Sequence, residues 1–65
     1  MFIYVFSNQD KNRLLSEGYQ LLKVDERGGV YIFSTEQDEA SIRHQLHDKK
    51  FSKLDRYVLS NVLSF

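Results

Sequence analysis

The segment Phe2-Ile3-Tyr4-Val5-Phe6 constrains the fold most, because it places five β-branched or aromatic residues in succession. Successive side chains of a strand point to opposite faces, so a strand of this composition presents apolar side chains on both of them. Ser7 and Asn8, which are typical of turns and helix caps, end the run. We therefore predict a central strand that is covered on both sides.

The chain of 65 residues is expected to form one α+β domain, residues 1–65. A domain of this size buries only about 60% of the surface of its unfolded chain. The sequence has no cysteine, so neither a disulfide nor a thiolate metal site stabilises it. We therefore expect either close packing or self-association to supply the missing stability.

A first helix is predicted from Asn8 to Glu17. Ser7 is placed to cap its N-terminus, and Gly18 is placed to end it in the left-handed conformation. Its inner stripe is expected to consist of Leu14, Leu15 and the aliphatic stem of Lys11.

Two strand patterns, Tyr19–Val24 and Val30–Phe33, flank the turn residues Asp25–Gly29 and predict an antiparallel hairpin. Thr35 then resembles an N-cap for a second helix that ends near Asp48. This helix has a sparse apolar stripe, which consists of Ala40, Ile42, Leu46 and Phe51.

The last segment, Tyr57 to Phe65, has high β-propensity and no charged side chain. We expect a strand here, bent at Ser60-Asn61, that pairs either beside the first strand or against a second copy of the protein. The order strand, helix, strand, strand, helix, strand predicts a small ferredoxin-like βαββαβ sheet with two helices on one face.

Charge is distributed unevenly although nine basic residues balance nine acidic ones. Residues 1–40 hold seven acidic and four basic side chains, whereas residues 41–65 hold two and five. The basic stretch from Arg43 to Arg56 is interpreted as a protein contact or as a solvated face. Together with the final strand it gives the candidate partner-binding residues, which are Arg43, Lys49, Lys50, Lys53, Arg56, Tyr57, Val62 and Phe65.

No motif predicts catalysis or a cofactor. His44 and His47 share one face of the second helix, and Asp48 lies in the same arc, but a metal site needs ligands from a further element. Ser41, His44 and Asp48 likewise lie along this face without a buried acid or an oxyanion site. We therefore interpret these residues as a solvated surface and predict a non-enzymatic protein that binds no metal.

Two segments resemble the signatures of the RNA recognition motif: Ile3-Tyr4-Val5-Phe6-Ser7-Asn8, and Arg27-Gly28-Gly29-Val30-Tyr31-Ile32-Phe33. The resemblance implies that Tyr4, together with Tyr31 or Phe33, stacks on the bases of single-stranded RNA. Gly29 stands where that family has an aromatic residue, and the zero net charge of the chain does not favour nucleic acid.

Most of the chain resembles short uncharacterised proteins of phages and prophages of Gram-positive bacteria. The matching segments are Phe2–Phe6, Leu14–Lys23, Val30–Phe33 and Tyr57–Ser60. The resemblance implies a protein that binds a host or defence factor as an inhibitor or adaptor, or a virion or assembly component that self-associates.

The sequence also predicts where the protein is found. No basic residue precedes the opening apolar run, and no apolar run approaches the roughly 18 residues of a membrane span. We therefore expect a soluble protein without a signal peptide, in the cytoplasm of the host cell.

Overall fold

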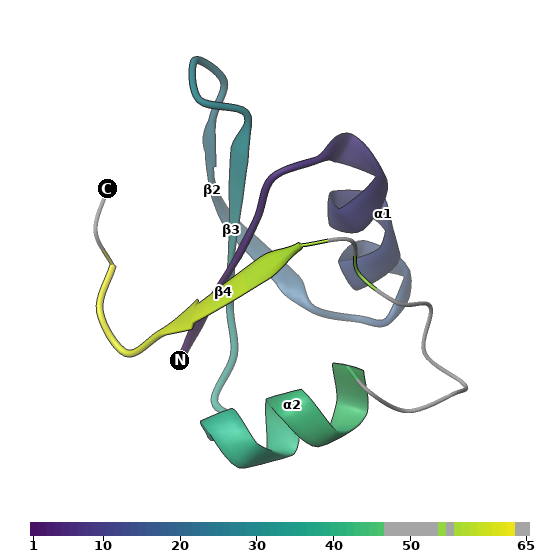
Figure 1. The fold of residues 1–65 in the computed structure, drawn as a ribbon, viewed down its shortest axis with the longest axis vertical. Helices are drawn as coiled ribbons and strands as arrows, with labels where there is room; N and C mark the ends of the chain where they lie inside the picture. The colour runs from purple at the N-terminus through teal and green to yellow at the C-terminus, as the bar shows by residue number, and fades with distance from the viewer. Residues whose placement is uncertain (47–53, 55, 64–65) are drawn as a thin grey trace.

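A computed structural model describes residues 1–46, 54 and 56–63. In this part of the chain, an antiparallel four-stranded sheet and two helices form a small α+β domain, as predicted (Figure 1). The elements in chain order are β1 (Phe2–Val5), α1 (Asn8–Ser16), β2 (Gln20–Asp25), β3 (Val30–Ser34), α2 (Glu39–Leu46) and β4 (Tyr57–Ser60).

The strands lie in the order β2-β3-β1-β4, so β1 is an inner strand. It pairs antiparallel with β3 on one side and with β4 on the other. Phe2 lies opposite Ser34 on β3 and opposite Ser60 on β4. The inner position predicted from the composition of Phe2–Phe6 is confirmed, although the strand itself ends at Val5.

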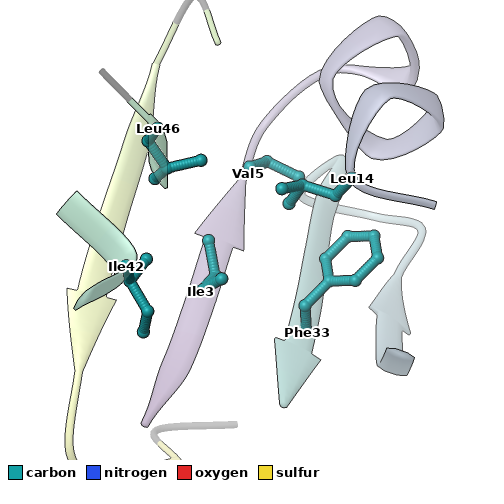
Figure 2. Close-up of a cluster of buried hydrophobic side chains, with 6 residues drawn as sticks. All are labelled: Ile3, Val5, Leu14, Phe33, Ile42 and Leu46. Carbon is teal, nitrogen blue, oxygen red and sulfur yellow. The ribbon is translucent and has the colours of Figure 1, made fainter. Parts of the chain in front are cut away.

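Both helices pack on the same face of the sheet. Side chains from α1, α2, β1 and β3 meet there in one cluster of buried residues, shown in Figure 2, which consists of Ile3, Val5, Leu14, Phe33, Ile42 and Leu46. Burying an aliphatic or aromatic side chain of this size stabilises a fold by about 1.5–3 kcal/mol. This cluster is therefore the main core of the domain.

A second, smaller cluster lies on the opposite face of the sheet. Tyr4, Val30 and Ile32 are its buried members, and Phe2 and Phe6 pack against them. All five come from β1 and β3 or directly follow β1, and none comes from a helix. We call this side the open face.

Helix α1 begins and ends as the sequence predicts. The Ser7 hydroxyl accepts a hydrogen bond from the Asp10 amide at 3.1 Å. At the other end, the Tyr19 amide donates to the Leu14 carbonyl, and Gly18 donates to Leu15. Gly18 has φ +92°, and this pair of hydrogen bonds with a left-handed residue is a Schellman motif.

The predicted inner stripe of α1 is partly wrong. Leu14 is buried and Lys11 is half-buried, but Leu15 is exposed and Asp10 is buried instead. Asp10 and Leu14 are four residues apart and therefore share one face, whereas Leu15 lies about 100° around the helix from Leu14. A helix of only nine residues has one narrow contact with the sheet, and Leu15 falls outside it.

Helix α2 begins three residues later than the predicted N-cap at Thr35 indicates. Its N-terminus is capped by Asp38, whose Oδ1 accepts from the Ser41 amide at 2.8 Å. Thr35 instead accepts from the Gln37 amide in the preceding turn. The hydrogen bonds from Ser41 lower the pKa of the Asp38 carboxyl, so this cap stabilises α2 above the ordinary carboxyl pKa and is lost as pH falls through the lowered value.

The apolar stripe of α2 is confirmed at two positions. Ile42 and Leu46 are buried in the main core, whereas Ala40 is exposed. The predicted end near Asp48 and the contact of Phe51 lie outside the described residues.

The hairpin of β2 and β3 is confirmed. The Asp25 Oδ1 atom accepts from the amides of Arg27 and Gly28, and Gly29 adopts φ +66° before β3 begins. The pairing register shifts between Leu21 and Lys23, which places a bulge in β2.

The last strand, Tyr57–Ser60, ends at the predicted bend, and the described residues after it, 61–63, form no strand. The Ser60 hydroxyl accepts from the Val62 amide at 3.1 Å and donates to the Val62 carbonyl at 2.8 Å. Serine side chains that bond nearby backbone groups in this way compete with the strand ladder. Of the two pairings predicted for this strand, the one beside β1 is present.

One buried charge connects α1 to the start of β4. The Asp10 side chain is 1% exposed, and its Oδ2 accepts from the Arg56 amide at 3.3 Å. Its Oδ1 lies 3.9 Å from Nη1 of Arg13. The carboxylate therefore holds the chain in place directly before the edge strand.

Replacing Asp10 by Ala should lower the free energy of unfolding by about 1–3 kcal/mol, because it removes the buried carboxylate that accepts from the Arg56 amide and lies beside Arg13. Urea unfolding followed by circular dichroism measures the change. Asn12→Ala, an exposed change on the same helix, is the control and should shift stability by no more than about 0.5 kcal/mol. Equal midpoints for Asp10→Ala and the wild type would show that the carboxylate does not hold β4.

Candidate functional site

In the described part of the chain, the sheet ends at β2 on one side and at β4 on the other. An edge strand has backbone N–H and C=O groups that face away from the sheet and can pair with another chain. Strand β2 carries two features that oppose such pairing, namely the bulge between Leu21 and Lys23 and the charges of Lys23 and Asp25. The β2 edge is therefore protected.

The β4 edge lacks these features. Its register with β1 is regular from Tyr57 to Ser60, and no charged side chain occurs between Tyr57 and Leu63. Val58, on the open face opposite Tyr4, is 48% exposed. We call Tyr57–Ser60 and its outward backbone groups the β4 edge, and we take it as the candidate site.

The segment after β4 adds apolar surface beside this edge. Val62 is 67% exposed, and Leu63 is exposed as well. The Tyr4 hydroxyl donates to the Val62 carbonyl at 3.1 Å, which brings this segment to the open face. Three exposed apolar side chains, Val58, Val62 and Leu63, therefore lie within six residues at one end of the chain.

Two of the predicted basic contacts have intramolecular partners. Nη2 of Arg43 lies 3.5 Å from Oε1 of Glu39, and both side chains are exposed. The Arg56 guanidinium lies 4.3 Å from the centre of the Phe6 ring, a cation–π contact. Lys49, Lys50 and Lys53 lie outside the described residues, so a basic contact surface stays a prediction.

The predicted apolar contacts differ in their surroundings. Tyr57 is partly buried against the main core, and its side chain is on the helix side of β4. Val62 is exposed beyond the end of the strand, and Phe65 lies outside the described residues. Val58 was missed by the sequence analysis, which did not divide this segment between two faces.

The aromatic residues proposed for RNA stacking do not lie on one surface. Tyr4 is on the open face, where it is 6% exposed. Phe33 is buried in the main core under the helices, and Tyr31 packs against that core with the Lys11 ammonium 5.3 Å from its ring centre. A sheet surface on which all three rings stack on bases is therefore not formed.

Helix α2 presents Ser41 and His44 on its exposed surface, whereas His47 and Asp48 lie outside the described residues. Among residues 1–46, 54 and 56–63, no three His, Cys, Asp or Glu side chains are grouped as metal ligands. The neighbouring Gln45 has a structural contact, since its Oε1 accepts from the Tyr19 hydroxyl at 2.5 Å. Burial, and then the charge of Glu17, raise the pKa of Tyr19, so this hydroxyl stays a donor at neutral pH.

No protein-family model, curated protein or solved structure matches the chain. Neither described helix has the length and apolar character needed to cross a lipid bilayer.

Replacing Tyr4 by Phe should loosen the segment after β4, because it removes the hydroxyl that donates to Val62 but keeps the ring in place. We expect faster chymotrypsin cleavage after Leu63 and a loss of about 0.5–1.5 kcal/mol in the free energy of unfolding. Tyr31→Phe makes the same chemical change on the other face of the sheet and should leave the cleavage rate unchanged. Equal cleavage of both variants and the wild type would contradict the role of this hydrogen bond.

Proposed function

We propose that this chain is a small non-enzymatic protein-binding module, and that its β4 edge accepts an extended segment of a partner protein. The observation that carries the proposal is the contrast between the two edges of the sheet. One edge has a bulge, Lys23 and Asp25, whereas the other is regular and uncharged. A partner strand can pair only where the backbone groups are accessible and regularly spaced.

We assign the domain to the ferredoxin-like arrangement. Three features support this assignment: the order of the elements, the strand order β2-β3-β1-β4, and β1 antiparallel to both its neighbours. In such a sheet the last strand is an edge, and a bound segment extends the sheet without changing the core.

Binding by strand addition divides affinity and specificity between two kinds of group. Backbone hydrogen bonds along β4 contribute affinity for many sequences, and side-chain contacts select among them. Val58, Val62 and Leu63 supply apolar contacts on one side of the added strand. The partner segment should therefore be extended, uncharged and apolar at alternate positions.

The resemblance to short phage and prophage proteins supports a biological setting for such a module. We propose that it works in the cytoplasm of the host cell as an inhibitor or adaptor of a host or defence protein. The alternative is a virion or assembly component, which uses the same edge to join further phage proteins.

A lysine in place of Val58 should abolish partner capture, since a charge at the centre of an edge strand opposes strand addition. Leu22→Lys is the matched control, because Leu22 is 51% exposed on the protected β2 edge. Each immobilised protein is incubated with lysate of a Gram-positive host, and the retained proteins and RNA are identified and quantified. We expect stoichiometric capture of one protein by the wild type and by Leu22→Lys, and a loss of at least tenfold for Val58→Lys.

Equal capture by both lysine variants would place the partner contact elsewhere, for example on the basic surface. Retention of RNA that is lost in Tyr4→Ala and kept in Val58→Lys would contradict the proposal and assign binding to the open face. Circular dichroism of each variant shows whether it is folded.

A further inference from the structure

An uncharged, regular edge strand is a template for pairing with another strand, and in a concentrated solution of this protein the most abundant strand of matching chemistry is the β4 edge of another copy. We infer that a second copy of this chain is the resting occupant of the β4 edge, paired antiparallel about a twofold axis beside Val58. This inference rests on the proposed function, because it names the chain that occupies the same edge before a partner displaces it.

The register follows from the two faces of β4. Val58 and Ser60 lie opposite Tyr4 and Phe2, on the open face, whereas Tyr57 and Leu59 pack toward the main core. Residues paired across two strands of one sheet share a face. Val58 and Leu59 lie on opposite faces, so a register that pairs them would break the continuous sheet. In an antiparallel pair about a twofold axis, the remaining registers are those in which one residue pairs with the same residue of the other copy.

Val58 is the residue best suited to this position. It is 48% exposed in the single chain, and pairing with its own copy covers that apolar surface with an identical β-branched side chain. Leu59 and Tyr57 are already partly buried against the core and gain less. In the register about Val58, Arg56 of one copy lies opposite Ser60 of the other, so no two like charges oppose each other.

The alternative symmetric dimer, in which the β2 edges of two copies pair, is disfavoured by the sequence of β2. A β2 edge paired with its own copy would have to place its bulge and charged residues, Lys23 and Asp25, in the interface. The β4 edge has no charge to pair, so the strength of the dimer should not depend on ionic strength.

A charge-complementation experiment tests the register directly. Sedimentation is measured over a range of concentrations for the wild type, Val58→Lys, Val58→Glu, and an equimolar mixture of the two variants. We expect a dimer for the wild type at low and high salt, monomers for each variant alone because two like charges meet at the axis, and a dimer for the mixture. A wild-type monomer at all concentrations, or a mixture that stays monomeric, would overturn the inference.

Disulfide cross-linking measures the same geometry without adding charge. The native chain has no cysteine, so an introduced thiol can pair only with the same thiol of another copy. Directly paired residues of an antiparallel ladder have Cα atoms about 4.5 or 5.5 Å apart, and both spacings allow a disulfide. Val58→Cys should therefore form a disulfide-linked dimer under mild oxidation. Ser60→Cys is the control on the same strand, because its two copies lie four strand positions apart, about 13 Å.

Cross-linking of Ser60→Cys but not of Val58→Cys would overturn the register. The failure of this inference can be told from the failure of the proposed function. A monomeric wild type whose partner capture is lost in Val58→Lys contradicts only the dimer. A Val58-centred dimer that captures no protein contradicts only the partner-binding function.

Discussion

The burial of β1 on both of its faces is the constraint on which the rest of the structure depends. Ile3 and Val5 are buried toward the helices, and Tyr4 between them is buried on the opposite side. A strand of this kind needs a neighbour on each side as well as cover on each face. Among the four strands of the described residues, β3 and β4 take those places, and β2 and β4 are the edges.

The two edge strands of the described sheet differ in sequence, and the proposed function rests on this difference. The β2 edge has a bulge and charged side chains, which are common protections of natural sheets. The β4 edge has neither. The residue directly before it, Arg56, is held by a hydrogen bond from its amide to the buried carboxylate of Asp10. Removing a charge from water costs free energy unless hydrogen bonds compensate, so the hydrogen bond from the Arg56 amide offsets part of the cost of burying Asp10 and fixes the start of β4.

The parts of the fold that depend on local sequence could be predicted. The inner strand, the cap at Ser7, the helix end at Gly18 and the hairpin around Asp25 all follow from short patterns, and each is present. The errors come from interactions across the fold or between a side chain and the backbone. Leu15 was predicted to be buried, but the contact of α1 with the sheet is centred on Leu14 and Asp10, and Asp10 is buried there with the amide of Arg56, a distant residue, as its hydrogen-bond donor.

The candidate site was only partly predictable for a related reason. The uncharged final segment indicated an edge contact and a bend at Ser60-Asn61, where hydrogen bonds between Ser60 and Val62 end the strand, but it did not indicate which side chains point to which face. Once the strand is limited to Tyr57–Ser60, alternation separates Val58 from Tyr57 and identifies the exposed one. Tyr4 and Phe33 show the same effect, since strand register alone decides that they lie on opposite faces.

The central claim is that the outward backbone groups of β4 are an accessible pairing site. Residue-resolved amide hydrogen exchange of β4, measured by nuclear magnetic resonance at several protein concentrations, tests it most directly. The account predicts an alternating pattern at low concentration, in which amides that face β1 are protected and those that face outward exchange fast, and protection of the outward amides as concentration rises. Outward amides that exchange fast at every concentration, and equally fast with a captured partner present, would contradict it.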